Sequence, residues 1–374
     1  MNVKKPIFSV LYNNKNITND IAKYMLSITY SDKTTGESDE VSIEMEDVDG
    51  LWKNGWYPEK GAKLTVTIEN LKCGVFEIDE IELRGAPDTV TIRGMATGLT
   101  NSLRTRKSDA HENKTLKQIA QKVAQKNNLT IQGDIPDITM NRVTQNKETD
   151  LGFLYRISRE FGLLFSVRDS VITFTSIFKI EDRKESFIID KSDLMSYSLK
   201  DKADGMIKTA SIKSKSAKKN EAISTNLEFE KYKKENPSYT SAPVNNQDSH
   251  VDSSRTENKQ QADAKAKVIM HLAASNQQKG TISIPFNSLA IAGNNFRLTG
   301  LGLLAGKYQI KASSHRIDKS GGAISELEIK RLQTPKKHEQ ITRKKQKTQP
   351  NNVDVKPIGF KQYKDDLTTF VNKK

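Results

Sequence analysis

The chain has 374 residues, 35% of them hydrophobic, with 60 Lys and Arg against 46 Asp and Glu, a formal net charge of +14 at pH 7. This length predicts two or three domains with cores of their own. The N-terminus lacks the apolar core of a signal peptide and no long apolar run follows, so we expect a cytosolic product without membrane insertion. The single cysteine, Cys73, excludes an internal disulfide and a cysteine-based zinc cluster, and its place at a strand start favours a packed thiol over a nucleophile.

The N-terminal part of the chain predicts strands. Residues 7–11, 26–30 and 41–46 are short β-type runs, and in 41–46 apolar and polar residues alternate, the period of a strand with one wet face. The loop that follows carries Trp52 and Trp56. Two indoles are able to form a sugar platform, but at this spacing they favour packing at the end of a barrel.

A pattern of glycines and alternating apolar residues occurs twice. Each copy has a glycine turn, a strand, a second glycine and an aromatic-x-Ile strand, with the same spacing between the glycines. The matching positions are Gly61 and Gly293, Gly74 and Gly306, and Phe76 and Tyr308. The pattern predicts two related β-units, although any two antiparallel hairpins share some of it.

The periodicity becomes helical in the middle of the chain. Residues 115–124 predict an amphipathic helix with Thr115 as N-cap, and residues 150–161 predict a second helix that ends at Gly162. A hairpin over 163–174 follows. The basic cluster at 103–108 is interpreted as an interface or solvated connector rather than a phosphate contact, because the positive charge is spread along the whole chain.

Candidate catalytic and metal-binding residues are few. Glu148, Asp150 and Glu160 suggest acid/base chemistry, but their position around a predicted helix favours capping and surface roles. The histidines are scattered and form no metal-binding motif. They are His111, His250, His271, His315 and His338. We therefore expect no catalytic residue, no cofactor site and no metal site.

The second half of the chain returns to strands. Residues 194–199 and 207–212 loosely echo 26–43, and the strand at 282–286 begins the second copy of the opening pattern. The polar segment 213–258 is interpreted mostly as a long mobile excursion, and helical pattern resumes over 256–274. Core signals end after Leu332, where a basic linker and a weakly amphipathic tail that is able to dock on a partner begin.

Together these patterns predict an α+β fold, mainly β, with two related β-units and a small helix-containing α/β insert. The family resemblance given below implies that the two units are β-barrel domains. The predicted domains are the first barrel (1–103), the insert (104–187), the second barrel (188–333, with the mobile excursion near 213–258) and the basic linker with the tail (334–374).

Four places carry a family resemblance through their order and spacing. They are the hairpin over 74–98 leading into 103–106, the helix from Thr115, the segment 150–162, and the helix over 262–273 running into the strand from Gly280. In this succession the chain resembles the bacteriophage late control gene D proteins, the hub proteins of contractile tail baseplates. It is also similar to the hub part of type VI secretion spike proteins. The tail after Leu332 is outside the match.

The resemblance implies a structural baseplate hub of a phage tail or phage-like contractile injection system. Such a hub is a homotrimer whose chains each donate two barrel domains to a pseudo-six-fold ring, which adapts the six-fold tail tube to the three-fold spike. The implied partners are the tail tube protein, the spike protein and other baseplate or tape-measure proteins, with DNA only passing through the channel. The implied location is the virion tail baseplate or an injection-system particle, assembled in the bacterial cytoplasm.

Two other classes of function stay open on the sequence alone. One is a cell-wall-binding or peptidoglycan-hydrolysing tail protein, because small two-helix folds beside strands also bind glycans. The other is a basic nucleic-acid-binding protein, because of the positive net charge.

Overall fold

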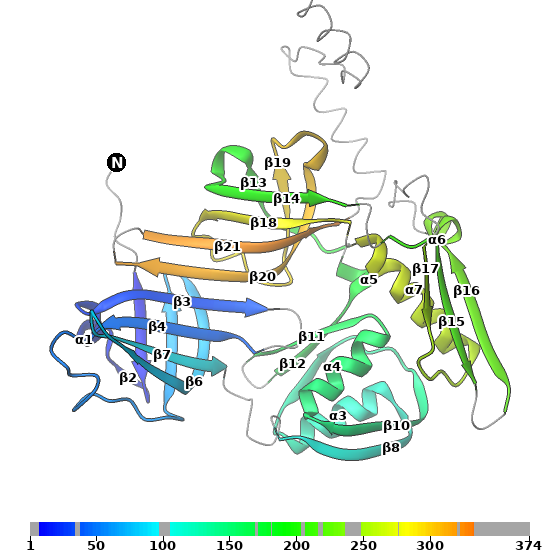
Figure 1. Ribbon diagram of the computed structural model, residues 1–374, viewed down its shortest axis with the longest axis horizontal. Coiled ribbons are helices and arrows are strands. Elements are labelled where there is room, and N and C mark those ends of the chain that lie inside the picture. The colour runs from blue at the N-terminus through cyan, green and yellow to red at the C-terminus, as the bar shows by residue number, and fades with distance from the viewer. Residues whose placement is uncertain are drawn as a thin grey trace, which may run out of the picture. The chain divides into compact units, whose positions relative to one another are not determined.

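The computed structural model describes residues 7–33, 38–96, 105–168, 171–180, 182–202, 206–215, 220–235, 248–275, 277–319 and 322–332 (Figure 1). The expectations for the basic linker, the tail, His338 and the start of the basic cluster at 103–108 lie outside these residues. The chain is mainly β with a smaller helical content, so the predicted fold class is confirmed.

The largest sheet contains both copies of the predicted repeat. It has 13 strands, of which 11 are hydrogen-bonded side by side along one path and two form a short branch at β20. The path runs through β14 (Ser196–Asp201), β18 (Gln278–Pro285), β21 (Gly322–Arg331), β20 (Gly306–Asp318), β3 (Met25–Lys33), β4 (Glu40–Glu46), β7 (Thr89–Ala96), β6 (Leu71–Arg84), β5 (Lys63–Ile68), β1 (Phe8–Tyr12) and β2 (Lys15–Asn16). The branch is β19 (Asn295–Thr299), which pairs with β20 and with β13 (Glu185–Asp190). The two related units therefore share one sheet.

The two copies of the glycine pattern have the same strand register. In each copy the backbone N–H of the first glycine donates to the carbonyl of the isoleucine that follows the aromatic residue. Gly61 donates to Ile78 at 2.8 Å, and Gly293 donates to Ile310 at 2.9 Å. The register shifts directly after this isoleucine in both copies, at a β-bulge. The predicted repeat is confirmed.

The outer strands of the two units also correspond. The order β3-β4-β7-β6-β5-β1 in the first unit matches β14-β18-β21-β20-β19-β13 in the second. The pair Ile28↔Ile43 in the first unit is matched by Tyr197↔Ile282 in the second. One difference is the direction of the last strand, because β1 is antiparallel to β5 whereas β13 is parallel to β19.

The helical insert has a core of its own between the two halves of the repeat. Its elements are β8 (Lys107–Thr115), α3 (Leu116–Lys126), β9 (Thr130–Gly133), β10 (Thr139–Glu148), α4 (Asp150–Glu160), β11 (Leu163–Arg168), β12 (Val171–Ser176) and α5 (Ile177–Ile180). Thr115 caps α3, accepting a hydrogen bond from the Gln118 N–H, and Gly162 follows α4 with φ +68°. Both predicted helices and the hairpin are confirmed.

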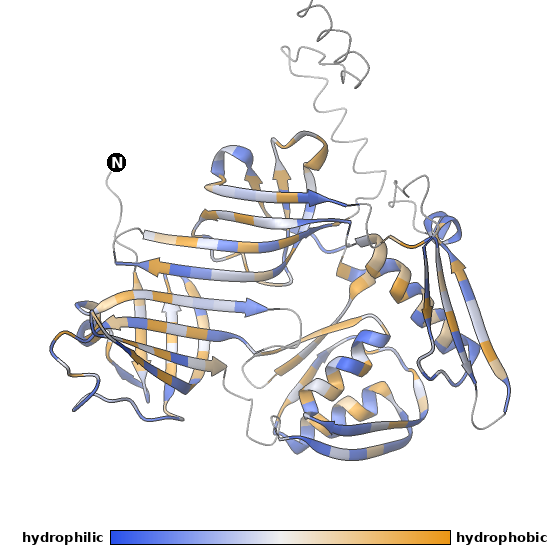
Figure 2. Cartoon of the chain, in the orientation of Figure 1, coloured by the Kyte–Doolittle hydropathy of each residue, from blue (hydrophilic) through white to orange (hydrophobic). Residues whose placement is uncertain are grey.

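The segment 213–258 was expected to be mobile, and this prediction is wrong for most of its described residues. A three-stranded sheet forms from β15 (Thr209–Lys215), β16 (Ala222–Glu228) and β17 (Ser249–Asp252), with α6 (Phe229–Glu235) and α7 (Lys259–Ser275) beside it. Phe229 and Tyr232 are buried with α7 residues in one cluster. Figure 2 shows apolar residues on both α7 and these strands. These two aromatic side chains supply the buried apolar surface of the segment, which its low content of aliphatic residues did not predict.

The strand at 207–212 was expected to echo the second strand of the first unit, and this too is corrected. It is β15, which belongs to the smaller sheet, whereas the partner of β14 is β18. The small sheet and α7 are inserted between β14 and β18, where the first unit has a short connection. Alternation of apolar residues predicts a strand, but it does not predict which strand will pair with it.

The remaining short elements are α1 (Thr18–Ala22) and two 3-10 turns, η1 (Lys191–Asp193) and η2 (Gly302–Leu304). Every helix in the described ranges falls short of the length and apolar content that a membrane-spanning segment needs.

Candidate functional site

The pairing of β3 with β20 joins the two repeat units inside one chain. The strands run antiparallel, from Ala312↔Lys33 to Asp318↔Ser27. On the same edge of β20, the part before the bulge pairs with β19 instead. A bulge bends and twists a strand, so that one long strand is able to pair with two different strands along the same edge.

A stacked aromatic pair lies at the centre of this junction. Tyr30 and His315 are both fully buried, and their rings stack with centroids 6.0 Å apart. The Tyr30 hydroxyl donates to Asp39 Oδ2 at 3.0 Å, and His315 Nδ1 lies 2.9 Å from Ser325 Oγ. Phe286 meets the imidazole edge-on. The two units are therefore held by a packed core as well as by backbone hydrogen bonds.

The environment of His315 keeps the imidazole neutral. Burial lowers its pKa to about 4, and a contact with the Ala290 backbone opposes this effect only in part. A neutral, enclosed imidazole stacked on a tyrosine acts as a packing group.

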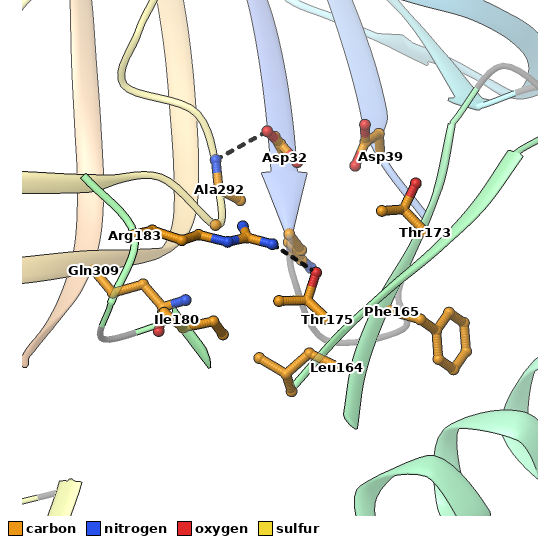
Figure 3. A pocket seen from close by; sticks show the side chains of 12 residues that line it. Asp32, Asp39, Leu164, Phe165, Thr173, Thr175, Ile180, Arg183, Ala292 and Gln309 are labelled. Carbon is orange, nitrogen blue, oxygen red and sulfur yellow. Dashed lines mark hydrogen bonds between the residues drawn. The ribbon is translucent and has the colours of Figure 1, made fainter. Parts of the chain in front are cut away.

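A cavity of about 250 Å³ lies beside the junction, where β3 and the insert meet (Figure 3). Asp32 and Asp39 line it from the first unit, and the Ala292 N–H donates to Asp32 Oδ2 at 3.0 Å. Arg183 donates to Thr175 Oγ1, also at 3.0 Å. The first contact joins the two repeat units, and the second lies within the insert. Within the ranges that the structure describes, no cluster of three or more His, Cys, Asp or Glu side chains is placed to hold a metal ion.

The three carboxylates considered for acid/base chemistry each lie against a cation. The pairs are Glu148 with Arg156 (3.1 Å), Asp150 with Lys107 (2.9 Å) and Glu160 with Lys265 (2.8 Å). The expected capping and surface roles need correction for Asp150, because Thr149 caps α4 and Asp150 is buried. Each of the three carboxylates therefore forms an ion pair within the protein.

Asp150 connects four elements of the insert. Its carboxylate accepts hydrogen bonds from Lys107 on β8, Asn127 after α3 and Gln145 on β10, at 2.9 to 3.2 Å. Burial raises its pKa, but the hydrogen bonds from Gln145, Lys107 and Asn127 outweigh burial, so the pKa is lowered. Lys107 and Asn127 are distant from Asp150 in sequence, which is why the local pattern gave no sign of this role.

We expect Asp150→Ala to lower the free energy of unfolding by about 2 kcal/mol, because three donors lose their common acceptor and two of them are largely enclosed. The contribution of the lowered pKa is present above the unfolded value near 4 and is lost as pH falls through the folded pKa. Denaturant unfolding at pH 7 measures the change.

Asp134→Ala is the matched control for this substitution. Asp134 is also paired with a lysine, Lys179, but both side chains are exposed, so we expect a change within about 0.5 kcal/mol. Equal effects of the two substitutions would contradict the role assigned to Asp150.

The described histidines lie on four different elements. His111 on β8 stacks on Phe153, and His250 on β17 is exposed. His271 on α7 is buried with its Nδ1 2.8 Å from the Tyr232 hydroxyl, and burial lowers its pKa to about 3. Buried, neutral histidines with aromatic neighbours are packing groups.

The two tryptophans do not share a flat face. Trp52 is buried in the core of the first unit, and Trp56 is 42% exposed. Their rings meet edge-to-face, 5.5 Å apart at 79°. This geometry confirms packing for Trp52 and does not provide a sugar platform. Cys73 is buried in the same core, as predicted for a packed thiol.

Two curated phage proteins match part of the chain. No protein-family model matches. Over 176 residues, 45% of the chain, it is 30% identical to a "probable baseplate hub protein" of Escherichia phage 186 and 32% identical to that of Escherichia phage P2. The resemblance to phage baseplate hub proteins is confirmed. The chain spans less than half of the length of these curated relatives, 44% and 45%.

Solved structures of phage tail proteins have the same fold. A tail protein of a prophage of Shewanella oneidensis superposes with a TM-score of 0.67 at 12% identity, covering 88% of this chain and 99% of that one. A tail protein of Neisseria meningitidis gives the same score at 10% identity, over 89% and 99%. A type VI secretion component of Escherichia coli gives 0.51 at 11% identity, over 84% and 74%.

Proposed function

We propose that the protein is a structural baseplate hub of a phage tail or phage-like contractile injection system. The hub is a homotrimer whose six repeat units form a pseudo-six-fold ring between the six-fold tail tube and the three-fold spike. The tube protein, the spike protein and other baseplate or tape-measure proteins are its partners, and DNA only passes through its channel. It acts in the virion tail baseplate or injection-system particle, by assembly and positioning rather than by a chemical step.

The observation that carries this proposal is the β3–β20 junction. One chain contains two units of the same strand order, and they already pair edge to edge. A head-to-tail contact between similar units generates a ring when its rotation closes. Three chains with two units each give the six positions that face a six-fold tube. The names of the relatives and the shared tail-protein fold support the same function.

The oligomeric state tests the proposal. We expect light scattering to give three times the 42.0 kDa mass of the chain, alone or after addition of the spike protein. Class averages in the electron microscope should then show a ring with six lobes and a central channel. A protein that stays monomeric with both tube and spike proteins present would contradict the proposal. Retention on DNA with steep salt dependence, or sedimentation with peptidoglycan, would then favour the other classes.

A further inference from the structure

Several strand edges of the large sheet, including those of β2 and β13, have no partner strand among the residues that the structure describes. Two of these open edges lie on strands equivalent to those of the β3–β20 junction. The first is β6 from Glu80 to Arg84, on the side away from β7, because β5 pairs only with the earlier part of β6. The second is the outer edge of β14, which pairs with β18 alone. Open edges present unpaired backbone groups that a further strand is able to satisfy.

The repeat relates these edges to the two strands of the β3–β20 junction. The part of β6 that follows its bulge corresponds to the part of β20 that follows its bulge. The first pair after the bulge is Glu80↔Arg93 in β6 and Ala312↔Glu328 in β20, and these two pairs are equivalent. β14 corresponds to β3, because β14 pairs with β18 in the same register in which β3 pairs with β4. The two open edges are thus the same two edges that already pair inside the chain.

We propose that the β6 edge of one chain pairs antiparallel with the β14 edge of a second copy, in the register of the β3–β20 junction. This inference rests on the proposed trimeric hub and assigns its interface between subunits. The internal junction and the intermolecular junction then alternate around the ring, and the third chain closes it.

The side chains on the two edges are complementary in this register. Carried over from the β3–β20 pairs, it sets Glu80 opposite Lys202, Glu82 opposite Lys200, and Leu83 opposite Leu199. Opposite charges directly across two strands stabilise the pair. Within the chain Glu80 contacts Arg93, and Glu82 contacts Arg84 and Arg93. A carboxylate has acceptor sites for a further cation besides these.

The apolar pair agrees with the internal junction. Leu83 and Leu199 occupy the positions of His315 and Tyr30, which are fully buried. Leu83 is 48% exposed in the single chain. Pairing with a second copy covers this leucine with another leucine.

The backbone pattern identifies the best site for a crosslink. At the junction the Lys319 N–H donates to the Leu26 carbonyl at 2.9 Å, so every second pair from there is hydrogen-bonded. Ser314↔Ser31 is one of the non-hydrogen-bonded pairs, in which the side chains of the two strands come closest. The corresponding positions are Glu82 and Lys200, and cysteines there have the separation that a disulfide needs.

The test is the double variant Glu82→Cys and Lys200→Cys in the full chain, oxidised and run on a non-reducing gel. We expect covalent dimers and trimers, with the trimer as the end point. The control combines Glu82→Cys with Asp201→Cys, one residue out of register on the opposite face, and we expect roughly tenfold less crosslinked product from it. Cys73 is present in both and is buried.

A charge exchange gives an independent measurement. Lys200→Glu should shift trimer toward monomer in light scattering, and adding Glu82→Lys to the same chain should restore the trimer. Because the pair is restored by two changes, loss of folding alone does not explain the result.

The outcomes separate this interface from the hub itself. A trimer that crosslinks no better than the control, or a disulfide formed within one chain, would overturn the assigned edges and leave the hub proposal standing. A chain that never trimerises, with or without spike protein, would overturn the hub proposal. Covalent trimers in the matched register support both.

Discussion

Replacement of Tyr30 by alanine is expected to lower the free energy of unfolding by about 4 kcal/mol, as for a buried aromatic residue. The ring is fully buried and lies 6.0 Å, centroid to centroid, from both His315 and Phe76. Its removal leaves a cavity at the strand pair that joins the two units, and the Asp39 carboxylate loses the donor at 3.0 Å. Denaturant unfolding measures the loss.

Tyr30→Phe is the matched control, because it keeps the ring and removes only the hydroxyl. We expect it to cost about 1 kcal/mol, the contribution of one hydrogen bond. In hydrogen exchange, Tyr30→Ala should reduce protection in β3 and the second half of β20 more than in the insert. If the alanine and phenylalanine variants were equally stable, the aromatic packing would not be what holds the units together.

Lowering the pH from 7.5 to 5 is expected to reduce the free energy of unfolding by about 4 kcal/mol through two buried histidines, about 2 kcal/mol each. The folded pKa is about 4 for His315 and about 3 for His271, against about 6.5 when unfolded. Between these values the unfolded chain binds more protons than the folded chain. Stability therefore falls as pH drops below 6.5 and stops falling, for these groups, below the folded pKa.

Burial has the largest influence on the pKa of each imidazole and lowers it, so this sign holds for both. His315 faces Tyr30, Ser325 and Phe286, and Lys330 lowers the pKa of His271 further. His315→Gln should remove about half of the pH dependence, measured as unfolding free energies at pH 7.5, 6.5 and 5. Equal pH profiles for the variant and the original protein would show that His315 titrates normally.

Local signals explain which parts of the fold were predictable. The threonine caps and apolar faces that define α3 and α4 lie within one or two helical turns. The repeat was visible because Gly61 and Gly293 occupy turns with positive φ, where a side chain is strained, and so marked the same point of both units.

Contacts between distant residues explain what was missed. The pair of His315 with Tyr30 and the partners of Asp150 are set by tertiary packing, and neither has a signal in its own segment. The open edges of β6 and β14 carry charged residues that look like an ordinary solvated surface. Their correspondence to the junction emerges only when the registers of the two units are compared.

The internal pairing of β3 with β20 also affects how a ring is able to grow. Two partners tethered in one polypeptide meet at an effective concentration set by the chain between them, independent of how much protein the cell makes. In the proposed ring, half of the contacts between units therefore form as each chain folds. The three remaining contacts need only two encounters between molecules, because the third contact closes the ring. Ring formation would then depend on protein concentration far less steeply than if six separate units had to meet.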